Sequence, residues 1–133
     1  LSVQLALEAA ETGHLVLATC HASDAANSIA RVLQMIAGSQ RALARGALAQ
    51  SLIGATFQCL LPTSNDHRVA AFELLQATPA VRNLSLEDKP AHIRSAMQTG
   101  RDGGMRTLKQ AVERLVDAGI VPAHQATNAA VGY

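Results

Sequence analysis

Hydrophobic and polar residues alternate along this chain with two different periods. In most segments the apolar residues recur every three or four positions, as Val3, Leu7 and Ala10 do, which is typical of one face of a helix. Residues suited to helix ends bound these segments, such as Gly13 at an end and Ser23 or Asp24 at a start. The predicted helices cover residues 2–11, 24–36, 40–50, 78–84, 89–99 and 108–116.

Other segments have the patterns of strands. Leu15–Ala18 is a continuous apolar run, which predicts a strand at the centre of a parallel sheet covered on both faces. Residues 53–61 alternate in character, and a second run, Val69–Leu75, follows the short polar stretch Pro62–His67, which predicts a β-hairpin. Strands with helices before, between and after them predict an α/β fold with a mixed sheet flanked by helices.

Composition narrows the possible functions. The formal net charge is +1, the 11 Lys and Arg residues are scattered, and only Phe57, Phe72 and Tyr133 are aromatic, so the chain lacks the basic field and the stacking platforms of nucleic-acid binding. The two cysteines, Cys20 and Cys59, lie far apart in apolar runs without CxxC partners, and we expect both to be reduced.

The longest uncharged run, residues 46–65, has about the length of a membrane span. Polar residues and Pro62 interrupt it, and its centre alternates as a strand does. We therefore predict neither a transmembrane segment nor a signal peptide.

The loop after Leu15–Ala18 is the first place to look for chemistry, because ligands of open α/β sheets collect beyond the carboxyl ends of the strands. It holds Thr19 and His21, and an imidazole there can bind a phosphate oxygen or position a water. An inert loop histidine remains the alternative. His14 lies at the other end of the predicted strand, roughly 23 Å from His21 at about 3.3 Å per residue, so the two cannot share a metal ion.

Phosphate-binding motifs receive little support from the residues alone. Gly100, Gly103 and Gly104 precede a helix and could receive an anion, or they could form a loop that starts the helix. The 133 residues contain no GxxxxGK[ST] sequence and no apolar strand that ends in an acidic pair for Mg²⁺. We predict no metal site.

Several sequences nevertheless resemble, in order, a known family of ATPases. The "ETGHLV…TLHT" histidine box of the secretion and pilus ATPases resembles Glu11–Val16 and Thr19–Ser23. The sequence "RVAAfEil…TPAIRNLIRE", from the branch that retracts type IV pili, resembles Arg68–Glu73 and Thr78–Leu84. The sequence "IQTG…GMQTL" of the same branch resembles Gln98–Gly100 and Gly104–Leu108.

This resemblance implies the C-terminal portion of a RecA-like P-loop NTPase core, with the histidine box in residues 1–75 and a C-terminal helical segment in residues 76–133. It also implies a six-subunit ring that hydrolyses ATP with Mg²⁺, whose ligands lie mainly outside these residues. The expected place is the cytoplasmic face of the inner membrane, peripherally bound, where the ring and an inner-membrane platform protein would drive pilus retraction and twitching motility.

By position in the motifs, His21 would sense or polarise the γ-phosphate, with Thr19 near the nucleotide and His14 in a supporting role. The segment of Ala80, Val81, Arg82, Asn83 and Leu84 would make the subunit or partner contacts linked to retraction. Ser85 and Leu86 stand where the family usually has Ile-Arg, which puts that partner contact in question. The alternatives are a pilus-extension or type II secretion ATPase, and a truncated, non-enzymatic interaction module.

Overall fold

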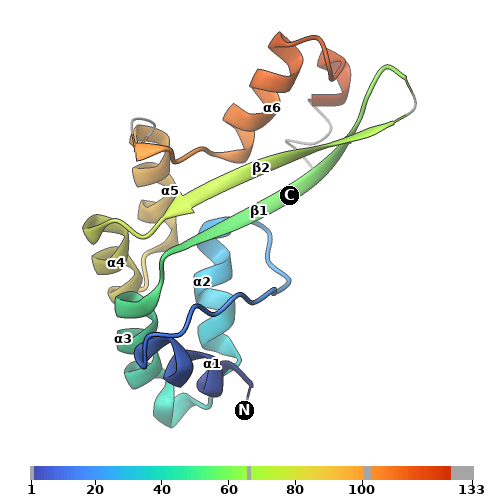
Figure 1. The fold of residues 1–133 in the computed structure, drawn as a ribbon. Coiled ribbons are helices and arrows are strands. Elements are labelled where there is room, and N and C mark those ends of the chain that lie inside the picture. The colour runs from blue at the N-terminus through green and yellow to red at the C-terminus, as the bar shows by residue number, and fades with distance from the viewer. Residues whose placement is uncertain (1, 66, 101–102, 127–133) are drawn as a thin grey trace.

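The computed structural model describes residues 2–65, 67–100 and 103–126, and Figure 1 shows them as a helical body with a long hairpin and one further helix. The predicted helices are confirmed to within a few residues at each end. In chain order the elements are α1 (Ser2–Glu11), α2 (Ala25–Gln34), the 3-10 helix η1 (Gly38–Gln40), α3 (Arg41–Ser51), β1 (Gly54–Pro62), β2 (Arg68–Gln76), α4 (Pro79–Leu86), α5 (Pro90–Thr99) and α6 (Leu108–Asp117).

Side-chain caps explain where several helices begin. The Asp24 carboxylate accepts a hydrogen bond from the Asn27 amide at 2.6 Å at the start of α2, which decides between Ser23 and Asp24. Thr78 caps α4, and Pro79 follows in the first turn, where its missing N–H costs nothing. These caps bind amides that have no partner within the helix.

The predicted hairpin is confirmed. β1 and β2 pair antiparallel from Gly54 with Gln76 to Pro62 with Arg68. Because side chains alternate across a strand, one face of the ribbon carries the buried residues Cys59, Leu61 and Ala71. The other face holds partly exposed residues.

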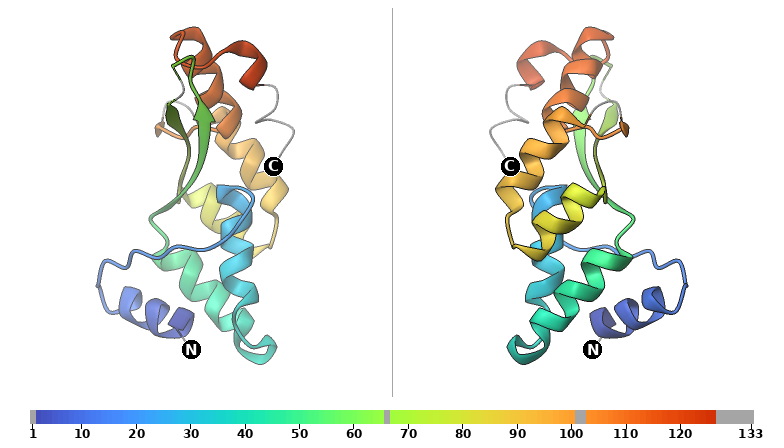
Figure 2. Two further views of the ribbon diagram at one scale, coloured as in Figure 1. Left: turned by 90° about the vertical axis from the view of Figure 1, so that its right-hand side faces the viewer. Right: turned by 90° about the vertical axis from the view of Figure 1, so that its left-hand side faces the viewer.

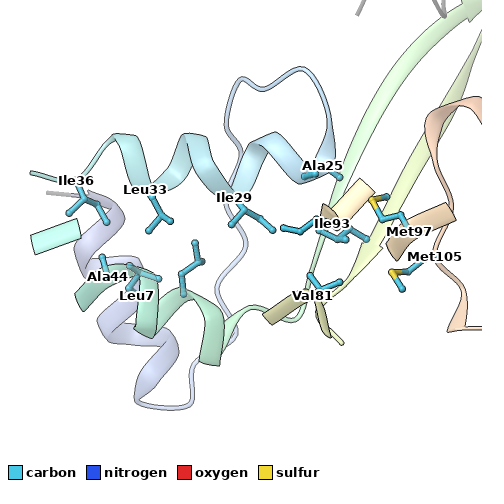
Figure 3. Close-up of a cluster of buried hydrophobic side chains, with 13 residues drawn as sticks. Leu7, Ala25, Ile29, Leu33, Ile36, Ala44, Val81, Ile93, Met97 and Met105 are labelled. Carbon is cyan, nitrogen blue, oxygen red and sulfur yellow. The ribbon is translucent and has the colours of Figure 1, made fainter. Parts of the chain in front are cut away.

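Two clusters of buried side chains form the core. The larger one lies among α1 to α5 at the base of the hairpin, and Figure 3 shows Ile29, Leu33 and Val81 within it. The smaller one lies between the hairpin and α6 and contains Cys59, Leu61 and Val112. In Figure 2, α1 and α3 lie at one end of the molecule, and α6 with the hairpin turn lies at the other.

The larger cluster takes side chains from both sides of position 75, for example Leu48 before it and Ile93 after it. The division into residues 1–75 and 76–133 stays a prediction. Both cysteines are free thiols, with Cys59 buried in the smaller cluster and Cys20 half-buried.

The predicted strand Leu15–Ala18 is wrong. Residues 14–22 form a coil that connects α1 to α2 (Figure 1), and Leu15 and Leu17 are 73% and 88% exposed. A strand needs a neighbour for its N–H and C=O groups, and the only sheet in the described part of the chain is the hairpin, which does not pair with this segment. Because of this, the distance expected between His14 and His21 loses its basis.

Candidate functional site

The coil from Thr12 to Asp24, which we call the histidine segment, carries the predicted nucleotide-contacting residues. It begins at the C-terminal end of α1, where Gly13 adopts φ +92°, a conformation that other residues rarely adopt. The Gly13 amide donates to the Ala10 carbonyl and the His14 amide donates to the Ala9 carbonyl, each at 3.1 Å. These two bonds form a Schellman motif that ends the helix.

His14 belongs to this helix end. Its Nδ1 atom lies 3.1 Å from Thr12 Oγ1 and 3.3 Å from the Ala9 carbonyl oxygen, although the ring itself is exposed. The geometry therefore gives His14 a part in ending α1, consistent with a supporting role.

Thr19 and His21 lie further along the histidine segment, and both are exposed. Across residues 2–65, 67–100 and 103–126, neither side chain makes a hydrogen bond or an ion pair. Both groups can therefore accept a ligand from outside the described structure. Four residues after His21, the chain enters the buried first turn of α2.

The first turn of α2 is held by a buried carboxylate that the sequence did not single out. Glu73 of β2 is only 4% exposed, and its Oε2 atom accepts a hydrogen bond from the Ala25 amide at 3.2 Å. The alternation of the strand gives the missing signal, because Glu73 stands in phase with the buried Ala71 and Leu75 and so must point inward.

Charges around Glu73 come from α2 and α5. Asp24 beside the helix start forms an ion pair with Arg94 of α5, with 3.3 Å between Arg94 Nε and Asp24 Oδ2. Burial raises the pKa of Glu73 above its ordinary value of 4.5, while the Ala25 hydrogen bond lowers it, Asp24 raises it and Arg94 lowers it by smaller amounts. The positive end of the α2 dipole faces the carboxylate.

Arg82, predicted as part of a partner-binding segment, makes internal bonds. Its guanidinium donates to the carbonyl of Ala77 at 3.0 Å and of Ala49 at 2.7 Å, and also to that of Gln50. Ala49 and Gln50 lie in the last turn of α3, just before β1, whereas Ala77 directly follows β2. Arg82 thus joins the two ends of the hairpin to α4 and satisfies carbonyls that α3 leaves without partners.

The other residues of this segment divide by burial. Val81 is fully buried and Leu84 packs at the edge of the larger cluster, whereas Ala80 and Asn83 are exposed. Only two of the five side chains are therefore fully available to a partner. Next to them, Ser85 is buried and donates to the Val81 carbonyl at 2.8 Å, and Leu86 is 46% exposed.

The start of α6, which follows the glycine-rich loop, is capped by its own side chains. Thr107 and Gln110 form a capping box in which each side chain binds the backbone amide of the other residue. Residues 101 and 102 lie outside the described residues. Among the rest, no group of three or more His, Cys, Asp or Glu side chains could hold a metal ion.

The family model of the type II/IV secretion system proteins matches residues 2–128. The chain belongs to this family. It is 43% identical over 120 residues to the type IV pilus retractation ATPase PilT of Pseudomonas aeruginosa, and 41% identical over 121 residues to a twitching motility protein of Neisseria gonorrhoeae. Each alignment covers 90% of this chain but only 35% and 32% of the relative, so the chain spans about a third of their length.

The fold of the chain is also similar to that of a solved structure. The crystal structure of the pilus retraction motor PilT with bound ADP superposes with a TM-score of 0.83 at 36% identity, over 96% of this chain and 36% of that one. The predicted fold class, α/β and part of a RecA-like ATPase core, is confirmed. No helix among the described residues of this family member is long and apolar enough to cross a membrane.

Proposed function

We propose that these 133 residues are the C-terminal part of a hexameric ATP-hydrolysing motor that powers type IV pilus retraction and thereby twitching motility. The identity of 43% to a pilus retractation ATPase, in order over 90% of the chain, carries this proposal. The superposition on a retraction motor with bound ADP supports it independently.

In this proposal His21 is the residue that contacts the γ-phosphate. It is exposed, is free of internal hydrogen bonds to the described residues, and lies on a segment anchored at both ends. Thr19 lies near the nucleotide, and His14 supports the segment from the end of α1. A histidine that reads the γ-phosphate can couple hydrolysis to movement between subunits of the ring.

ATP and Mg²⁺ fit the described residues only in part. His21 and Thr19 can reach a phosphate, but the sequence has no GxxxxGK[ST] loop to surround it, and the described part of the chain has no metal-binding group. Mg²⁺, when bound, neutralises charge on the β- and γ-phosphates. Its ligands and the phosphate cradle belong to residues of the full-length protein outside these 133, and the isolated chain is expected to be inactive.

The partners in this proposal are five further copies in a ring and an inner-membrane platform protein, with the ring peripheral at the cytoplasmic face. A head-to-tail interface that closes into a ring can pass a movement from one subunit to the next. Ala80 and Asn83 are the members of the predicted retraction segment exposed enough to contact a partner directly.

The histidine role is tested in a full-length ATPase that carries these residues. His21→Ala should leave nucleotide binding near normal and reduce kcat by roughly a hundredfold, within the range of a positioned proton-transfer or charge-stabilising group. His67→Ala, an exposed histidine at the hairpin turn, is the control. An unchanged kcat for His21→Ala would remove His21 from the reaction.

Retraction is tested with Asn83→Ala, because this exposed side chain makes no hydrogen bond or ion pair with described residues. ATP hydrolysis should stay within about twofold of normal while retraction fails in twitching assays, as a surface change seldom disturbs folding. Arg82→Ala should also stop retraction, but its internal bonds predict a loss of stability as well. Normal twitching in both variants would favour an extension or secretion ATPase.

The chain's own lack of a phosphate loop favours one second candidate, a non-enzymatic interaction module. A GxxxxGK[ST] sequence encoded upstream in the same reading frame would rule this candidate out. If that sequence is absent there, the proposed motor fails.

A further inference from the structure

We propose that Glu73 is a positioning residue for His21, acting through the first turn of α2. The proposal rests on the function given above for His21. Glu73 lies on β2 and Ala25 lies 48 residues earlier in the chain, so their hydrogen bond ties the histidine segment to the hairpin.

The geometry around Ala25 leaves few other ways to fix this end of the segment. Ala25 is fully buried, and its amide is one of those at the start of α2 that lack a helical partner. Asp24 accepts from the Asn27 amide instead, two residues further on. Ala25 is the buried residue of α2 that lies nearest to His21 in the sequence, and Glu73 is the acceptor that holds it.

Solvent exposure separates the Glu73 bond from two other contacts of this region. Asn27 donates to Ser23 Oγ at 2.9 Å in an exposed hydrogen bond, and the Arg94–Asp24 pair is also reached by water, with the Arg94 side chain 48% exposed. Exposed pairs of this kind add little to rigidity. A buried bond to a carboxylate is stronger, and its loss leaves a buried amide without a partner.

Packing alone does not explain why the Glu73 carboxylate is buried. An apolar residue in phase with Ala71 and Leu75 would continue the core of the strand without any desolvation cost. Glu73 instead presents an acceptor to the start of a helix whose positive dipole end offsets the carboxylate charge. This chemistry fits a residue that fixes the direction in which the chain enters α2 from His21.

The test uses four variants. Glu73→Leu removes the acceptor, Glu73→Gln keeps its length and an acceptor oxygen, and Glu73→Asp keeps the charge but shortens the reach. Ser85→Ala is the matched control, because Ser85 is equally buried and binds only within α4.

In the 133-residue chain, hydrogen exchange of the Ala25 amide is measured relative to the exchange of the most protected core amides. Glu73→Leu should accelerate it roughly tenfold or more, and Glu73→Gln should leave it within about threefold. Equal exchange in Glu73→Leu and Ser85→Ala would overturn the positioning role. If Glu73→Leu does not fold, the same comparison is made between Glu73→Asp, expected to be fast, and Glu73→Gln.

In a full-length ATPase that carries these residues, Glu73→Leu and Glu73→Asp should lower kcat roughly tenfold with KM unchanged, and Glu73→Gln should restore it. In a His21→Ala background, Glu73→Leu should have no further effect on kcat. Additive losses would overturn the proposal. If His21→Ala alone leaves kcat intact, the proposed function fails, while Ala25 exchange still decides whether Glu73 fixes the segment.

Discussion

Residues 15–18 and residues 54–62 are both rich in apolar side chains, but only the second segment forms a strand. β1 finds its partner β2 after a turn of five residues, and the pair buries Leu61 to 2% exposure against α6. The first segment has no partner strand in the described part of the chain, and Leu17 is 88% exposed. Apolar composition thus permits a strand, whereas an available neighbour decides whether it forms.

The largest change in the free energy of unfolding is expected when a buried leucine of the hairpin is shortened to alanine. Leu61→Ala is expected to lower the free energy of unfolding by about 2–5 kcal/mol, because Leu61 fills the cluster between the hairpin and α6. Urea denaturation followed by circular dichroism measures this. A loss below about 1 kcal/mol would show that the α6 cluster contributes little to folding.

Arg82 tests how firmly the hairpin is held at its base. Arg82→Ala is expected to lower the free energy of unfolding by about 1–3 kcal/mol, since carbonyls of Ala49, Gln50 and Ala77 lose a charged donor. The control is Arg114→Ala, an exposed arginine on α6. Equal stability of the two variants would leave Arg82 free for the partner role predicted from its motif.

Glu73 is the point where the hairpin contacts the end of the histidine segment, and its ionisation should show in the pH dependence of stability. Because burial raises the pKa of Glu73, its contribution is most favourable below the ordinary value of 4.5 and is lost as pH rises through the folded-state pKa. The stability of the wild type relative to Glu73→Gln should therefore fall as the pH is raised from values below 4.5 to values above it. A constant difference across denaturation curves at these pH values would contradict this.

The smallest effect is expected in the histidine segment. Leu17→Ala makes the same chemical change as Leu61→Ala, but it should alter the free energy of unfolding of this chain by less than about 0.5 kcal/mol, because Leu17 is already in water. The same denaturation experiment compares the two variants directly. A loss as large as that of Leu61→Ala would mean that the segment is buried in solution.

Local signals predicted most of the fold. Helical periodicity, the cap at Asp24 and the alternation of the hairpin all act within a few residues, and each is found in the structure. The strand at residues 15–18 depends on a distant partner, and no pattern within four apolar residues can report whether that partner is present. Its prediction failed for this reason.

The candidate site divides in the same way. Thr19 and His21 were predicted first from their place after residues 15–18, a strand that the structure does not contain, and then from their motif. The structure leaves both exposed on the coil, and their roles stay predictions. Glu73 was not predicted as a site residue, although its phase in β2 indicates burial. The bond between Glu73 and Ala25 links residues 48 apart, and only the folded chain brings them together.

The contacts of Arg82 also have a mechanical consequence. One guanidinium binds carbonyls just before β1 and just after β2, so the two legs of the hairpin cannot separate at their base without breaking hydrogen bonds to a charged group. Pulling the two strands apart at their base would therefore also load the start of α4, where Arg82 lies.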